Sequence, residues 1–318
     1  MPKVTLRWPF MLLVAVVVSG ILLGTYVFGR GGRIARKPPG VGQEPTISLY
    51  MHETGQIKSI KMEDYVQGVV AAEMDPNWPV NALGAQAILA RTFTMKKIQE
   101  GGVKARGTDA STDVEEFQAY APQKINDNVR RAVEMTRGMV VKFGGQLINA
   151  WFHASGGPQT AASAAEGLDY HQEAAPYIQS VKDPGYGITA PENKSWSATF
   201  SSSEIRAAVR RISGQDPGNI SNIKILEKGP SGRATKIQVN NITVSGPALR
   251  LALGNDRLRS TLLTGTEIAG DKITFKGQGY GHGVGMSQWG ARALAEQGKT
   301  PEEIIKYFFR DVKLERAW

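Results

Sequence analysis

The stretch that decides the fold is residues 62–97, which reads MEDYVQGVVAAE (62–73), MDPNWP (74–79) and VNALGAQAILARTFTMKK (80–97). The two outer parts have apolar residues every three to four positions, which is the period of a helix with one buried face. The prolines of the middle part interrupt this pattern, because a proline disfavours helix at the residue before it. The sequence therefore predicts two helices joined by a break.

Glu73 stands out in this stretch because it lies on an apolar face. It follows Val66 by seven positions, Val69 by four and Val70 by three, which places it on the side of the helix that carries the valines. A carboxylate there loses hydration, which raises its pKa and keeps a proton available near neutral pH. This is the property that a general acid needs, and the break after the helix would place Glu73 at a helix end that opens toward a cleft.

Arg91 is a similar anomaly on the second helix, four residues after Ala87 and three after Ile88. It could face Glu73 across a helical hairpin, as an active-site partner or as a structural ion pair that locks the two helices together. A close arginine would lower the pKa of Glu73 and oppose the effect of burial. The spacing alone leaves these interpretations open.

Outside this stretch, strand and helix signals follow one another irregularly. Residues 195–275 are expected to form a smaller α+β lobe, in which Ser201 and Glu204 make a capping box that opens a helix. Thr300 and Glu303 open a late helix in the same way. No regular βαβ alternation is present, so the predicted class is α+β, with a mixed α/β body over 46–318. Strands are expected at 47–51, 57–60, 139–143, 147–152, 223–227, 236–239 and 272–275.

The N-terminus is predicted to anchor the chain in a membrane. Residues 8–29 carry no charge and are rich in Leu, Val and Ile. At about 1.5 Å per residue, a helix of this length crosses a hydrocarbon core of about 30 Å. We therefore expect a cytoplasmic tail (1–7), a transmembrane helix (8–29) and a linker (30–45) rich in Gly and Pro. A cleaved signal peptide would have a shorter apolar stretch and a small-x-small site, which is missing here.

The net charge of +9 does not indicate nucleic-acid binding. Residues 1–45 carry six basic residues and one acidic residue, which leaves 32 basic and 28 acidic residues, or +4, for residues 46–318. Anionic lipid headgroups explain the excess beside the predicted membrane span. The chain has no cysteine, and its four histidines lack metal-ligand spacing. The sequence therefore predicts no disulfide, no metal site and no cofactor.

Two glycine-rich segments are candidate walls of a site: FHASGG at 152–157 and GQGYGHGVGMSQWG at 277–290. Glycine allows a backbone to approach a ligand closely. Neither segment has the dinucleotide or the Walker pattern. His282 and Ser287 suggest a nucleophile with its base, but no third member of a serine-hydrolase triad is identifiable.

Together these segments resemble the stage II sporulation protein D family. The resemblance spans roughly 47–314, and its last motif is long enough to be highly specific. The N-terminal span also matches the sporulation members of the family. The motifs that carry the resemblance are VVAAEM (69–74), Trp78-Pro79, ALGAQAILARTF (82–93), FHASGG (152–157) and GYGHGVGMSQ (279–288).

The resemblance implies a peptidoglycan lytic transglycosylase, which cleaves between N-acetylmuramic acid and N-acetylglucosamine and leaves 1,6-anhydro ends. It assigns the general acid and base to Glu73 and an active-site role to Arg91. It makes Ser155, Tyr280 and His282 candidates for contacts to the sugar. Some family members hold zinc through cysteine, and this chain has no cysteine.

The resemblance also implies partners and a location. The partners are peptidoglycan glycan strands, a sporulation amidase that removes stem peptides, and a further membrane protein of the engulfment complex. The body would lie on the extracytoplasmic side of the cell membrane and act on the septal wall. A literal positive-inside count of the flanking charges points to the cytoplasm instead, but the charge count alone does not settle the orientation. The alternative is a non-catalytic amidase enhancer or wall-binding protein with a structural Glu73–Arg91 pair.

Overall fold

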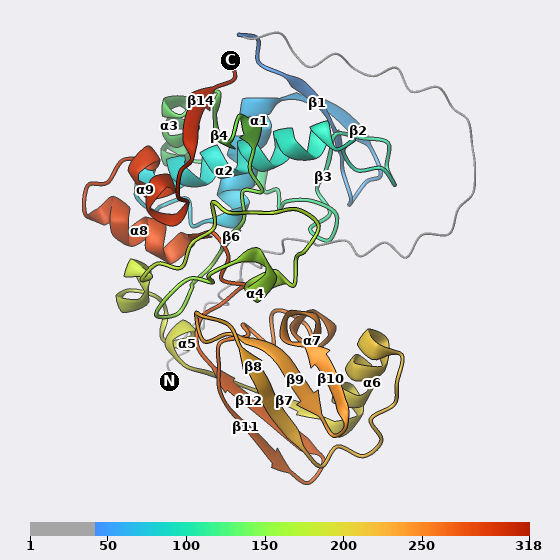
Figure 1. The fold of residues 1–318 in the computed structure, drawn as a ribbon. Coiled ribbons are helices and arrows are strands. Elements are labelled where there is room, and N and C mark those ends of the chain that lie inside the picture. The colour runs from blue at the N-terminus through green and yellow to red at the C-terminus, as the bar shows by residue number, and fades with distance from the viewer. Residues whose placement is uncertain (1–41) are drawn as a thin grey trace, which may run out of the picture.

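The two helices on either side of the 74–79 break are the centre of the larger part of the fold. The computed structural model describes residues 42–318, in which α1 spans Met62–Glu73 and α2 spans Val80–Gln99. Both predictions are confirmed, with α2 two residues longer than expected. α2 packs against α1, α3 (Asp127–Met135), α8 (Gln288–Glu296) and α9 (Pro301–Phe308), so it is surrounded by helices (Figure 1).

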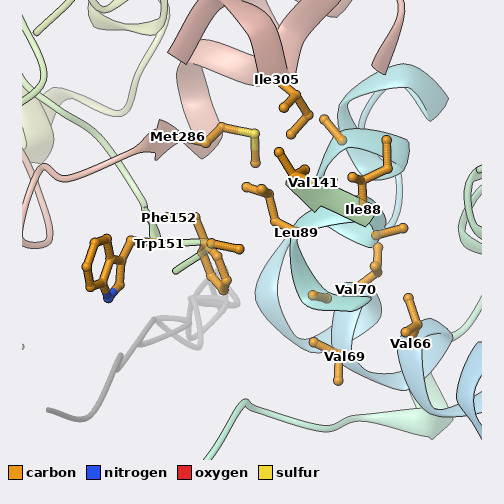
Figure 2. Close-up of a cluster of buried hydrophobic side chains, with 14 of the residues drawn as sticks. Val66, Val69, Val70, Ile88, Leu89, Val141, Trp151, Phe152, Met286 and Ile305 are labelled. Atoms are coloured by element: carbon orange, nitrogen blue, oxygen red, sulfur yellow. The ribbon is translucent and has the colours of Figure 1, made fainter. Parts of the chain in front are cut away.

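The buried faces of α1 and α2 form the main hydrophobic core. The valines of α1 and the central Ile and Leu of α2 have no exposed surface. Burying one such side chain contributes roughly 1.5–3 kcal/mol, so this face stabilises the hairpin strongly. Figure 2 shows side chains of this core from both helices and from more distant segments: Val66, Val69, Val70, Ile88, Leu89, Val141, Trp151, Phe152, Met286 and Ile305.

Small sheets surround this core. β1 (Thr46–Tyr50) pairs with β2 (Ile57–Lys61) in the predicted antiparallel hairpin and with β3 (Ala110–Ser111) in parallel. The other sheets here are β14-β4-β5 and the parallel pair β13-β6. Their strands are β4 (Met139–Phe143), β5 (Gln146–Leu147), β6 (Phe152–His153), β13 (Met286–Ser287) and β14 (Lys313–Arg316).

The predicted strand over 147–152 is wrong as a continuous element. Only its two ends belong to strands, and the residues between them are buried without being in a sheet. The Asn149 N–H donates to the Tyr177 hydroxyl at 2.9 Å, and the Trp151 N–H donates to the Asn149 carbonyl at 2.9 Å. These bonds satisfy backbone groups that a strand would have paired with a neighbouring strand.

Residues 196–275 contain a second hydrophobic core. The sheets here are β11-β12-β7 and β10-β9-β8, with α6 and α7 packed against them (Figure 1). The expected boundaries of the lobe, 195–275, stay a prediction. The elements are β7 (Trp196–Ser201), α6 (Ser202–Ser213), β8 (Ile223–Lys228), β9 (Ala234–Val239), β10 (Ile242–Ser245), α7 (Gly246–Ala252), β11 (Leu263–Ala269) and β12 (Lys272–Gly277).

Both predicted capping boxes are present, Ser201 with Glu204 at the start of α6 and Thr300 with Glu303 at the start of α9. In each, the cap hydroxyl accepts from the backbone N–H three residues on, and the glutamate accepts from the backbone N–H of the cap. This satisfies two N–H groups that a helix leaves unpaired. The remaining short elements are η1 (Pro122–Lys124), α4 (Ala164–Leu168), η2 (Pro184–Gly187) and α5 (Pro191–Lys194).

The predicted membrane anchor needs a correction. Among residues 42–318, no helix is both long and apolar enough to cross a membrane. The longest of them, α2, carries Arg91, Lys96 and Lys97, and charges within a span are costly. The expected span itself (8–29) and the tail before it lie outside the described residues. We therefore correct the fold class to α+β with several sheets and drop the predicted single-pass membrane localisation.

A buried ion pair joins α1 to α2. The Arg91 guanidinium donates to both carboxylate oxygens of Glu63, with distances of 3.2 Å from Nε and 2.6 Å from Nη2. It also donates to the Met139 carbonyl at 2.9 Å, and Glu63 accepts from the Gly138 N–H and from the Trp318 indole. Arg91 is fully buried. The pair therefore ties both helices to the start of β4 and to the C-terminus.

We expect Glu63→Gln to lower the free energy of unfolding by about 3–5 kcal/mol, because it leaves the Arg91 charge buried without its partner. The matched control is Glu267→Gln, which breaks an exposed pair with Lys276 and should cost less than about 1 kcal/mol. Urea unfolding of both variants measures the difference. Equal small losses in the two variants would contradict the role given to the buried pair.

Candidate active site

Glu73 is the last residue of α1, and its carboxyl group is almost fully buried. One carboxyl oxygen, Oε1, accepts from the Ala119 N–H at 3.1 Å. The other, Oε2, has no hydrogen-bond partner among the described residues. The Glu73 backbone carbonyl accepts from the side-chain amide of Gln288 at 3.0 Å. The end of the helix is thus held in place while one carboxyl oxygen stays unpaired.

Burial determines the protonation state of Glu73. Loss of hydration raises the pKa of Glu73 to about 8, and the hydrogen bond from the Ala119 N–H lowers the pKa by less than burial raises it. The arginine that was expected to lower it lies elsewhere, against Glu63. Glu73 is therefore mostly protonated at pH 7, as a general acid must be.

Neutral polar side chains lie near the end of α1 that carries this carboxyl group. Tyr65 is buried close enough for the Glu73 charge to raise its pKa, and its hydroxyl lies beside Thr94 and Gln118. The amide of Gln288 is 3.4 Å from Gln86 Oε1. Sequence reasoning had assigned no role to these residues, although Gln86 and Gln288 lie within the quoted motifs. Their position in those motifs was the signal that could have found them.

A surface of two indoles and a guanidinium lies beside this region. Trp78 follows Glu73 by five residues, and Trp289 follows Gln288 directly. The two rings are 4.8 Å apart between centroids at 60°, and both are half-buried. The Arg292 guanidinium lies 5.3 Å and 5.1 Å from their centroids. Indole faces left partly open in this way can stack against an apolar face of a ligand.

The structure does not bring Arg91 to Glu73, so the expected contact between them is wrong. Arg91 and Glu73 lie on the facing helices, but the guanidinium is directed to Glu63 at the other end of α1. The periodicity was correct in placing both residues inside. It could not identify the partner, because two buried carboxylates of α1 were available to one arginine.

Ser155, Tyr280 and His282 form a separate cluster. The backbones of Ser155 and Tyr280 exchange two hydrogen bonds, of 3.0 Å and 2.8 Å. His282 accepts from the Val284 N–H and lies against His153, with 5.6 Å between ring centroids. This cluster is connected to the Glu73 region through the backbone, because β6 pairs with β13 and the Trp289 N–H donates to the Ala154 carbonyl at 3.1 Å.

Neither histidine acts as a base for Ser287. The Ser287 hydroxyl donates to Asp183 at 2.7 Å, and Asp183 also accepts from the backbone of Gly156 and Gly185. Burial lowers the pKa of His282 well below its ordinary value. Within residues 42–318, no three His, Asp or Glu side chains are grouped in a way that could hold a metal ion.

Comparison with known proteins finds one family and one domain that match parts of this chain. The family described as Stage II sporulation protein matches residues 50–143, and a domain of unknown function matches residues 171–285. The chain is 30% identical over 307 residues to stage II sporulation protein D of Bacillus subtilis, which covers 89% of this chain and 84% of that protein.

Two further relatives are similar at the same level. Stage II sporulation protein D of Bacillus amyloliquefaciens is 30% identical over 297 residues, which covers 87% of this chain and 82% of that protein. A Bacillus subtilis protein named Amidase enhancer is 30% identical over 290 residues, which covers 77% of this chain and 39% of that protein. The first match segment, 50–143, contains both Glu73 and Arg91.

The raised pKa of Glu73 predicts how stability depends on pH. Its ordinary pKa is 4.5 and its folded value is about 8, so the folded chain binds more protons than the unfolded chain between these values. Glu73 should therefore cost the protein stability as the pH rises through this window, at about 1.4 kcal/mol per pH unit at most.

Denaturant unfolding of the wild type and of Glu73→Gln at pH 5 and pH 8 measures this effect. We expect the Gln variant to become more stable relative to the wild type by several kcal/mol at the higher pH. The exposed control Glu302→Gln should show no such trend. A constant difference between the wild type and Glu73→Gln would contradict the raised pKa.

Proposed function

Because this chain belongs to the stage II sporulation protein D family, we propose that it is a lytic transglycosylase that acts on the glycan strands of peptidoglycan. Glu73 serves as general acid and then as general base. The observation that carries the proposal is its buried carboxyl group, which keeps its proton at neutral pH and has one oxygen without a partner. The relatives named for sporulation support a role in that process, and we propose that this role is remodelling of the septal wall during engulfment.

The reaction needs only this one carboxyl group. Protonated Glu73 donates its proton to the oxygen between C1 of N-acetylmuramic acid and the next N-acetylglucosamine, and the C1–O bond breaks. The Glu73 carboxylate then takes the proton of the muramic 6-hydroxyl, whose oxygen attacks C1 and closes the 1,6-anhydro ring. Since the nucleophile belongs to the substrate, the second carboxylate of ordinary glycosidases is unnecessary. Glu73 ends the cycle protonated.

The neighbouring residues have supporting roles in this proposal. The Ala119 N–H, at 3.1 Å from Oε1, stabilises the carboxylate that forms after the first proton transfer. Gln288 holds the backbone of Glu73 in place. Arg91 acts at a distance from the chemistry, by fixing α1 against α2 through Glu63.

An amidase partner fits this reaction. The relative named Amidase enhancer supports a connection with an amidase, although this chain spans only 39% of its length. We propose that such an amidase removes stem peptides before this chain cleaves the glycan. A non-catalytic enhancer is the alternative, and it requires that Glu73 has no effect on the glycan bond.

Product analysis tests the proposal. Purified glycan strands, with and without stem peptides, are incubated with the wild type, Glu73→Gln or the exposed control Glu302→Gln, and the products are read by mass spectrometry. We expect anhydro-muramic ends from the wild type and the control. Glu73→Gln should be slower by a factor of about 100 or more, because the amide cannot donate the proton.

Two outcomes would overturn the proposal. Reducing ends that contain added water would mean a hydrolase with a second carboxylate. No cleavage by any of the three proteins, with glycan binding intact and an amidase accelerated, would establish the enhancer function instead.

The indole surface predicts a further effect on glycan cleavage. We expect Trp289→Ala to raise KM for glycan strands roughly fivefold, because one stacked aromatic contact contributes about 1 kcal/mol, and to leave kcat within a factor of about three. Ile57→Ala, which changes an exposed apolar residue of β2, is the control. Unchanged KM values in Trp78→Ala and Trp289→Ala would exclude this surface from the binding site.

A further inference from the structure

Three arginines meet at the junction between the two hydrophobic cores. Arg233 and Arg250 are buried, and Arg259 is half-buried. Among the described residues, none of them has a carboxylate oxygen within ion-pair distance. Their hydrogen bonds go to neutral acceptors instead. These are the Gln159, Gly156, Asn255 and Arg259 carbonyls, the Ser231 hydroxyl and the Asn193 side chain.

The carboxylates nearest to these arginines attract them without direct contact. Burial lowers the pKa of Arg233 and of Arg250 to about 10, and it lowers the pKa of Arg259 as well. Glu166 and Asp183 attract Arg233, Asp256 attracts Arg250 and Glu192 attracts Arg259. The Ser231 hydroxyl bridges Arg233 to Glu166, because it accepts from the guanidinium and donates to the carboxylate. Residues 195–277 carry 12 basic and six acidic residues, so this part alone has a net charge of +6. Buried charges are normally paired, because an unpaired one loses hydration without compensation.

Unpaired polar atoms lie in the same place. The Tyr280 and Ser155 hydroxyls and Nε of Arg259 are buried and have no hydrogen-bond partner in the described structure. The Arg259 guanidinium lies 4.3 Å from the centroid of the Tyr280 ring, and Arg250 and Arg259 both lower the pKa of Tyr280 against the effect of burial. Buried polar groups normally have partners, so a group that accepts hydrogen bonds and carries negative charge would complete this cluster.

Resting on the function proposed above, we propose that Arg250, Arg259, Tyr280 and Ser155 form a binding site for a carboxylate carried by the glycan. Guanidinium groups and hydroxyls donate hydrogen bonds in a geometry that suits a carboxylate. The site is connected to the acid, because Ser155 follows β6 and β6 pairs with β13, directly before Gln288.

Two groups of peptidoglycan supply this chemistry. The first is the lactyl carboxylate of a muramic residue that has lost its stem peptide. The second is a carboxylate of the stem peptide itself, in which case the lactyl group is an amide without charge. Neutral chitotetraose has the same sugar backbone with no carboxylate, and it serves as the reference ligand.

Calorimetry tests the proposal on the full-length chain with Glu73→Gln, which prevents cleavage. The ligands are chitotetraose and muramic-acid tetrasaccharides with and without stem peptides. We expect a carboxylated ligand to bind at least tenfold more tightly than chitotetraose. Arg259→Gln and Tyr280→Phe should reduce this preference to within about threefold without weakening the binding of chitotetraose. The carboxylated ligand whose affinity falls in Arg259→Gln and Tyr280→Phe identifies the source of the carboxylate.

The control is Arg211→Gln, an exposed arginine of α6, which removes the same charge from the same lobe and should keep the preference. Tyr280→Phe keeps the ring and changes only the hydroxyl, so a thermal unfolding midpoint equal to that of the parent excludes misfolding.

Equal binding of charged and neutral ligands by the parent would overturn the proposal. Equal weakening of both ligands by Arg259→Gln would overturn it as well. Either result leaves the anhydro-product test of Glu73 unaffected, so the two proposals can fail independently.

Discussion

The burial of one carboxyl group at the end of α1 is the constraint on which the candidate site depends. The apolar face that packs α1 into the core also removes water from Glu73, and this raises its pKa to about 8. The burial that keeps Glu73 protonated also disfavours its carboxylate form, so ionisation of Glu73 lowers the stability of the fold. The ion pair between Glu63 and Arg91 at the other end of α1 keeps the helix in a position where this burial is maintained.

Local patterns were sufficient to predict the two helices of the hairpin and the burial of Glu73. The 3.6-residue period located α1 and α2, and the same period placed Glu73 and Arg91 inside. Both capping boxes could also be predicted from the sequence, since all the residues of each box lie within four positions. The strand expected over 147–152 failed because a buried irregular segment and a buried strand have the same apolar composition. The Tyr177 hydroxyl that satisfies its backbone comes from a distant position.

Contacts between distant segments could not be predicted in this way. Gln288 reaches the end of α1 across 215 residues of sequence, and Arg91 finds Glu63 rather than Glu73 because of how the two helices pack. The arginines at the junction come from two loops (Arg233 and Arg259) and from α7 (Arg250), and they lie close together only in the folded chain. The glycine-rich motif connects these parts, since one end holds Tyr280 and His282 and the other end holds Gln288.

A direct titration of the Glu73 side chain tests the central claim. Carbon-13 NMR of the carboxyl groups, with Glu73→Gln used to assign the signal, follows this one group through the pH range. A midpoint near 8 is the predicted result. A midpoint near 4.5, the ordinary value for glutamate, would mean that Glu73 is ionised at neutral pH, and it would contradict the account of Glu73 as an acid that burial keeps protonated.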